Sequence, residues 1–182
     1  MEVQVMENTN HLSSFVNELA NKYTMYFDVY RNEWLEDIPL SFLAQYRRRD
    51  ERYMFTKKIK IYGVENQQIV FATACNEVNA DFIHQFQQRI KDNLHHYTIK
   101  HQEHMSTIVI GLIITDEEIH STVAKEVNRY RKLKFLKYGL HGWAEIYLAI
   151  IQPHEKKIFV HPKGKPFVSS IEKYFWEGNK VK

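Results

Sequence analysis

The sequence predicts an α+β fold, a single domain in which a mixed sheet of about five to six strands packs with three main helices. Three observations lead to this prediction. The chain has 182 residues and 44% of them are hydrophobic, which is enough for one sizeable core. Segments of helical period alternate with segments of period two. The 6 glycines and 4 prolines are scattered, so no linker divides residues 1–182, and only 1–10 and 177–182 are expected to be flexible.

Two amphipathic helices are predicted from the spacing of apolar residues. The first covers residues 11–24 and follows a possible cap at Asn10. The second follows Asn79, and its apolar positions run from Phe82 to Leu94. The aromatic-rich stretch between residues 26 and 39 has no clean period, so we predict a loop there.

A third helix is predicted from a capping box, Thr115-Asp-Glu-Glu118, which would satisfy the first free backbone N–H groups. Gly139 is expected to end this helix in a left-handed C-cap. A short terminal helix is predicted over residues 167–176.

A three-stranded antiparallel meander is predicted between the first two helices, where the period changes to two. With Asp50 and Glu51 as a two-residue turn, Arg49 lies opposite Arg52. The run from residue 68 to 75 supplies the third strand. This register gathers apolar residues on one side of the sheet and basic residues on the other.

The centre of the sheet is predicted at residues 107–114, an almost unbroken run of β-branched and aliphatic residues typical of a strand buried on both faces. The strand over residues 143–151 is expected to run parallel to it, after a crossover through the third helix. Residues 156–160 are expected to pair antiparallel with that strand.

A basic binding surface is predicted on the hairpin of the meander. The formal charge of +3 excludes a polycation or an acidic tail. Residues 47–62 nevertheless contain seven basic and two acidic residues. The predicted binding residues are Arg47, Arg49, Arg52, Lys58, Lys60 and Tyr62.

Two kinds of partner suit this predicted surface. The cations would contact the phosphates of a nucleic acid while Tyr62 stacks on a base, or they would contact an acidic protein surface. A basic side of the third helix, with Lys125, Arg129 and Lys132, would extend the surface. The alternative is an ordinary hydrated face, whose arginines pair with acids such as Glu36 and Asp37.

A histidine cluster supports a second hypothesis, a metal-dependent hydrolase. His95, His101 and His104 are candidate zinc ligands, and Glu103 with His104 is a candidate acid/base pair. The spacing does not place these residues on one helical face, and no nucleophile motif accompanies them. The favoured prediction is therefore a non-catalytic binding module without a cofactor.

The remaining predictions concern location and assembly. The sequence contains no secretion signal and no membrane span, and its single cysteine, Cys75, suits a structural thiol in the cytoplasm. The 25 aromatic residues, more than one core obviously requires, allow a homo-oligomer surface.

Two resemblances accompany these predictions. The predicted order α-β-β-β-α-β resembles the core of restriction-endonuclease-like nucleases, but the strand over residues 68–75 lacks their carboxylates and lysine. The segments Thr56-Lys-Lys-Ile-Lys-Ile-Tyr62, Glu103-His-Met-Ser106 and Gly139-Leu-His-Gly-Trp143 resemble a small uncharacterised bacterial family. That resemblance covers about residues 11–165 and implies no activity.

Overall fold

The structure is a computed structural model that describes residues 2–53, 60–98, 104–136 and 142–177. Side chains are described for residues 11–46, 67–98, 106–136 and 142–173. In chain order the elements are α1 (Glu2–Tyr23), β1 (Asp28–Tyr30), β2 (Trp34–Leu35), β3 (Ile38–Pro39), β4 (Phe42–Tyr53), β5 (Lys60–Ala74), α2 (Ala80–Tyr97), β6 (His104–Ile114), α3 (Ser121–Arg129), β7 (Arg131–Phe135), β8 (Trp143–Gln152), β9 (Lys157–Val160), η2 (Pro162–Gly164) and α4 (Lys165–Glu177).

The chain has the predicted α+β architecture with a mixed sheet. The main sheet contains seven strands in the order β1-β4-β5-β6-β8-β7, and β9 also pairs with β8. β1, β4 and β5 are antiparallel neighbours, whereas β5, β6 and β8 run parallel. A second sheet consists of β2 and β3 alone.

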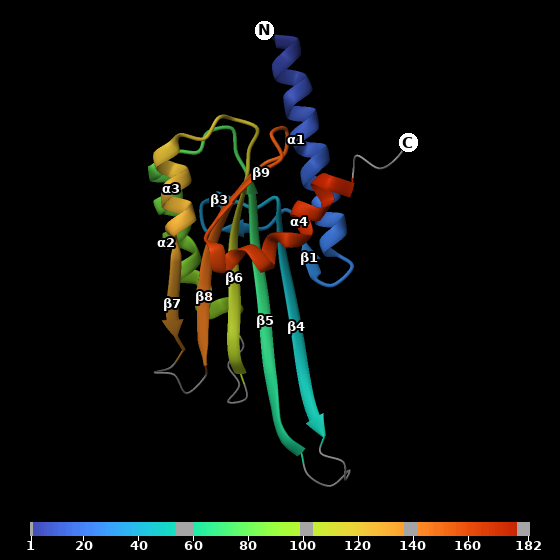
Figure 1. Ribbon diagram of the computed structural model, residues 1–182, viewed down its shortest axis with the longest axis vertical. Helices are drawn as coiled ribbons and strands as arrows, with labels where there is room; N and C mark the ends of the chain where they lie inside the picture. Colours follow the sequence, from blue (N-terminus) through green and yellow to red (C-terminus); the bar gives the residue numbers. More distant parts are fainter. Residues whose placement is uncertain (1, 54–59, 99–103, 137–141, 178–182) are drawn as a thin grey trace.

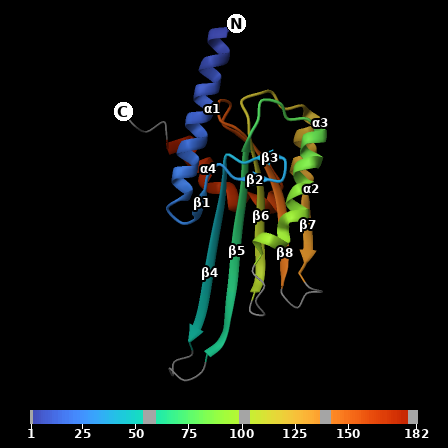
Figure 2. The same ribbon diagram turned by 180° about the vertical axis from the view of Figure 1, so that it is seen from behind.

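Helices cover the sheet on both sides (Figures 1 and 2). The α1/α4 face receives alternate residues of the central strand, such as Ile110 and Leu112, while Val109 and Ile113 point to the α2/α3 face. All four side chains are fully buried. The predicted central strand is therefore confirmed, since β6 is covered on both faces as its unbroken apolar sequence requires.

Several predicted elements are confirmed. Asn79 caps α2, because its side-chain oxygen accepts a hydrogen bond from the backbone N–H of Phe82 at 2.9 Å. β6 and β8 form the predicted parallel pair, and β9 pairs antiparallel with β8. The terminal helix is α4. The first helix begins at Glu2, earlier than the predicted residue 11.

The predicted register of the meander is wrong. Asp50 and Glu51 do not form a turn but continue β4, where they pair with Val64 and Gly63. Arg52, which the predicted turn places at the start of a second strand, also belongs to β4. The described residues 60–62 and residues 68–74 of the predicted third strand belong to one long strand, β5, which continues without a loop through Gly63. The predicted and the observed register both keep the two-residue alternation of apolar side chains. This alternation alone therefore does not determine which register forms.

The predicted third helix is too long at both ends. Thr115 is buried, and its hydroxyl accepts a hydrogen bond from the N–H of Glu117, so it closes a local turn rather than a helix. The helix begins instead at Ser121 after the cap His120, and it ends at Arg129. The next five residues form β7, because the open edge of β8 offers them a strand partner. Gly139 lies outside the described residues.

The predicted loop between residues 26 and 39 contains three short strands. β1 pairs with β4, whereas β2 and β3 form a hairpin of their own. Leu35 and Ile38 of that hairpin are buried against the α2/α3 face. In the described part of the chain, no helix has the length and apolar character that crossing a membrane requires.

Candidate nucleic-acid interface

A two-stranded ribbon extends β4 and β5 beyond the rest of the sheet (Figure 1). β6 begins to pair with β5 at Glu65, so residues 60–64 pair with β4 and with no other described strand. Five residues of extended chain span about 17 Å. A bulge between Glu51 and Tyr53 shifts the register near the end of the described ribbon. We call this extension, together with its base where β5 still pairs with β6, the β4–β5 ribbon; it comprises residues 47–53 and 60–66.

Five of the six predicted binding residues lie on this ribbon. Arg47, Arg49 and Arg52 belong to β4, and Lys60 and Tyr62 belong to β5. Their side chains, and the whole of Lys58, lie outside the described residues. Arg49 pairs with Glu65 rather than with Arg52, so the assignment of all six residues to one face no longer follows from a turn at residues 50 and 51.

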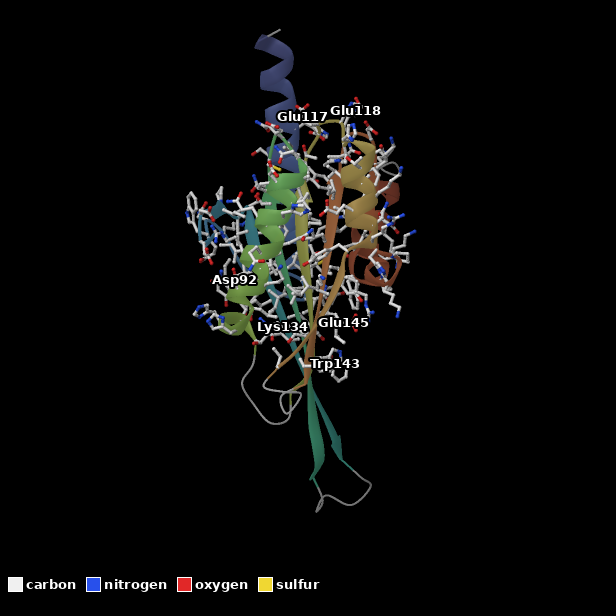
Figure 3. All side chains as sticks on the ribbon, turned by 90° about the vertical axis from the view of Figure 1, so that its left-hand side faces the viewer. Asp92, Glu117, Glu118, Lys134, Trp143 and Glu145 are labelled. Carbon is white, nitrogen blue, oxygen red and sulfur yellow. The ribbon has the colours of Figure 1, made fainter. Side chains whose placement is uncertain are left out.

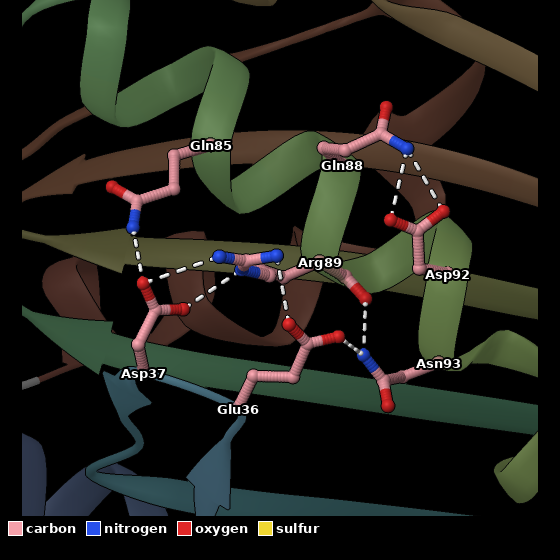
Figure 4. A network of polar contacts seen from close by, with 7 residues as sticks. All are labelled: Glu36, Asp37, Gln85, Gln88, Arg89, Asp92 and Asn93. Carbon is pink, nitrogen blue, oxygen red and sulfur yellow. Dashed lines mark hydrogen bonds and ion pairs between the residues drawn. The ribbon is translucent and has the colours of Figure 1, made fainter.

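The acids that the hydrated-face alternative required are bound elsewhere (Figure 4). Glu36 and Asp37 form the turn between β2 and β3 and reach Arg89 of α2, with Nη1 at 2.7 Å from Glu36 and Nε at 2.7 Å from Asp37. Gln85 donates a further hydrogen bond to Asp37. These contacts hold the pKa of the Asp37 carboxyl below its ordinary value, chiefly through the hydrogen bond from Arg89.

A second basic surface lies at the opposite edge of the sheet, where α3 meets β7. A groove of about 530 Å³ is lined there by Thr122, Lys125, Glu126, Arg129, Tyr130, Arg131 and Lys132. We call it the α3–β7 groove. Lys125, Arg129 and Lys132 come together here as predicted, although Lys132 is supplied by β7 rather than by a longer helix. Tyr130 and Arg131 were not predicted as groove residues, because the sequence predicts that this segment lies inside the third helix.

The residues that line the groove include hydrogen-bond donors without a partner among the described residues and one acid, Glu126, that is bound by its neighbours. Tyr130 is 8% exposed, and its hydroxyl has no hydrogen-bond partner among the described residues. Burial raises the pKa of this phenol to about 12, so it stays a neutral donor. Glu126 turns toward α2, where its carboxylate accepts from Gln87 at 3.2 Å and lies 2.9 Å from Nε2 of His84.

Arg131 is held in place from the α1/α4 face of β8. Its Nε donates to Glu145 at 3.1 Å and lies 3.4 Å from the Tyr147 hydroxyl, which itself donates to Glu145. The pKa of Glu145 is lowered, chiefly by the hydrogen bond from Arg131. Figure 3 views this edge, with Glu145, Trp143 and Lys134 toward one end and Glu117 and Glu118 toward the other.

The two basic surfaces belong to different parts of the sheet. β5, β6 and β8 separate β4 from β7. At about 4.8 Å per strand, the strands that carry the two surfaces are about 19 Å apart. The ribbon and the groove are therefore two sites, and a single ligand reaches both only if it is extended.

The candidate hydrolase residues are scarcely described. His101 and Glu103 lie outside the described residues, and His104 is the first residue of β6 without a described side chain. His95 is exposed near the end of α2, with Nδ1 2.8 Å from the carbonyl oxygen of Asp92. Within the described ranges, no three His, Cys, Asp or Glu side chains form a group suited to a metal. Cys75 is partly buried, and desolvation raises the pKa of its thiol to about 11, as expected for a structural thiol.

Comparison with known proteins identifies a family whose description states no activity. A protein-family model described as a domain of unknown function (DUF8052) matches residues 11–173. No curated protein and no solved structure matches the chain. The predicted resemblance to an uncharacterised family is confirmed, while its bacterial origin stays a prediction.

Proposed function

Since the chain belongs to the DUF8052 family, whose description states no function, we propose from the structure that it is a non-catalytic module that binds nucleic acid through the β4–β5 ribbon. The observation that carries this proposal is the continuation of β4 and β5 beyond the sheet in a segment rich in basic residues, with Arg47 and Arg49 at the base of the extension and Arg52 and Lys60 on it. Seven basic and two acidic residues lie between positions 47 and 62.

The shape of the ribbon suits a nucleic-acid groove. The major groove of B-DNA is about 12 Å wide and admits a two-stranded β-ribbon. Cations along both strands would contact the phosphates on either side, and these contacts fix position rather than sequence. Because Glu36 and Asp37 are bound to Arg89, these two acids are not available to neutralise the ribbon.

The other predicted partners and roles remain alternatives. An acidic protein would suit the same cations, and a cytoplasmic location suits the single cysteine. Exposed Met25, Tyr26 and Trp34 would suit a homo-oligomer surface. The metal-dependent hydrolase would require His95, His101 and His104 to converge with Glu103, which the described side chains neither establish nor favour.

The experiment is a binding titration of the full chain and of R49Q/R52Q/K60Q with random-sequence duplex and single-stranded oligonucleotides. We expect the wild type to bind at about 50 mM salt and to lose at least tenfold in affinity at about 200 mM, because phosphate contacts release counterions. The variant should bind more weakly, with a smaller dependence on salt.

The matched control is K163Q/K165Q/K173Q, which removes the same charge from three exposed lysines, two in α4 and one just before it. It should bind as the wild type does, and both variants should keep the wild-type circular dichroism spectrum. Failure of the wild type to bind at about 50 mM salt, or equal losses in both variants, would contradict the proposal. Binding of polyglutamate but not of oligonucleotides would favour the acidic-protein alternative.

A further inference from the structure

We propose that the α3–β7 groove is an anion site that binds a polyphosphate group. The groove is separate from the β4–β5 ribbon, and the inference does not depend on the function proposed for the ribbon. Two observations lead to it: three cations without a partner among the described residues line the groove, and the carboxylate of Glu126, which also lines it, is bound by side chains of α2.

The cations are arranged around one space. Lys125 and Arg129 are four residues apart and lie on one side of α3, while Lys132 belongs to the neighbouring strand. Lys125, Arg129 and Lys132 form no ion pair or hydrogen bond with a described residue. Three cations so close together repel one another, and a ligand with several negative charges relieves that repulsion.

Arg131 lies beside this group but does not belong to it. Its side chain lies on the α1/α4 face of the sheet, where Nε donates to Glu145 and lies near the Tyr147 hydroxyl. Consecutive residues of a strand point to opposite faces, so Arg131 and Lys132 do not face the same space.

Tyr130 lines the groove but does not supply a donor to it. Its hydroxyl has no partner among the described residues, but it is fully buried, so a ligand in the groove does not reach it. Thr122 lines the same groove and offers a hydroxyl donor.

Two features oppose an anion, and both are weak. The carbonyl end of α3 carries a partial negative charge, but at an exposed helix end this charge opposes an anion only weakly. The carboxylate of Glu126 faces His84 and Gln87 rather than standing alone in the groove. A volume of about 530 Å³ is within the range of small-molecule sites and accommodates a triphosphate or a short stretch of nucleic-acid backbone.

The test is calorimetric titration of the full chain with sodium tripolyphosphate and, separately, with a random-sequence oligonucleotide. We expect the wild type to bind tripolyphosphate and K125A/K132A to bind it at least tenfold more weakly. Y130F removes a buried hydroxyl that a ligand in the groove does not reach, so it should bind tripolyphosphate as the wild type does. Since this substitution removes an unsatisfied buried hydroxyl, Y130F should be as stable as the wild type or more stable.

The controls separate this site from the ribbon. K165A/K173A removes two exposed lysines of α4, and Y26F removes an exposed hydroxyl, so both should bind tripolyphosphate normally. R49Q/R52Q/K60Q should also bind it normally, whatever that variant does to oligonucleotides. If K125A/K132A weakens only tripolyphosphate, the ligand is a free polyphosphate; if it weakens both ligands, nucleic-acid backbone also uses the groove.

Two results would overturn the inference. One is absence of tripolyphosphate binding by the wild type at about 50 mM salt. The other is affinity unchanged in K125A/K132A.

Discussion

Gly111 marks the place where α2 lies closest to the central strand β6. A Cβ added there would lie 2.6 Å from Cδ2 of Leu148, 2.7 Å from Cδ1 of Ile90 and 3.1 Å from Cε1 of Phe86. All three atoms are the far ends of buried side chains, so they can move only by leaving well-packed rotamers. The absence of a side chain at residue 111 lets two layers of the fold come together.

We therefore expect G111A to destabilise the protein by about 1–3 kcal/mol, the usual cost of overpacking a core. Urea unfolding followed by circular dichroism measures this difference. G111S should be less stable still, because it adds a polar oxygen to the same apolar space. A G111A variant as stable as the wild type would show that the α2–β6 contact adapts without strain.

Single residues also show what the sequence was able to predict about helix ends. Asn79 was recognisable as a cap because its short side chain is followed by a regular apolar stripe, and no tertiary contact competes for it. Thr115 has the same local signature but is fully buried, and its backbone N–H donates to Ile151 of β8. The capping box was misleading because the sheet determines the conformation at Thr115.

Among the elements, β4 and β5 show why the ribbon was not predicted. The two-residue period places Phe42 and Ala44 on the core face in either register, and Asp50-Glu51 is an acceptable turn by composition. The observed pairing of Phe42 with Ala72 places the core segments of both strands side by side. Which apolar segment pairs with which depends on contacts across the whole sheet, and local sequence does not encode that choice.

In the edge pair β7–β8, the ionisation of the Glu145 carboxyl depends on the neighbouring side chains. Glu145 accepts hydrogen bonds from Arg131 and Tyr147, and its side chain is 18% exposed. Because its pKa in the folded protein is lower than the ordinary value of 4.5, ionised Glu145 favours the folded state. This stabilisation is complete above the ordinary value and is lost as the pH falls through the lower, folded value.

We expect E145Q to be less stable than the wild type by about 1 kcal/mol at neutral pH. The difference should remain constant down to about pH 5 and then shrink as acid protonates Glu145 in the wild type. Urea unfolding at several pH values measures this difference. A gap that stays the same, or widens, at acid pH would contradict the assigned role of the Glu145 charge.

At the scale of the whole molecule, the basic residues are distributed over two distant places. The formal charge of +3 for the whole chain does not reveal either of these two groups of basic residues. The ribbon carries one group beyond the sheet, and the opposite edge carries the other beside α3. Most of these cations are predicted by counting charges along the sequence. Their separation in space depends on the order of the strands, which places β4 and β7 on either side of the parallel strands.

The core and the ribbon are also distinct parts of the molecule. Among the described side chains, the buried apolar residues of β4 end at Ala44, and those of β5 begin at Ile69. The described residues 50–53 and 60–64 lie beyond the last pairing with β6, and neither core cluster has a member between positions 50 and 64, so removal of this segment leaves every described contact of both clusters in place. Arg49 and Glu65 are directly paired, which is the geometry that a two-residue turn requires.

We therefore expect a variant in which Asn-Gly replaces residues 50–64 to fold normally. An Asn-Gly type I′ turn matches the twist of the strands that it would join, and a shorter loop has a smaller closure entropy. Its thermal midpoint should lie within a few degrees of the wild-type value, because the core is intact. The same variant should lose most of its affinity for oligonucleotides but bind tripolyphosphate as the wild type does. A variant that unfolds would show that the ribbon supports the core, and one that still binds oligonucleotides as tightly as the wild type would show that the ribbon beyond residue 49 is not the nucleic-acid site.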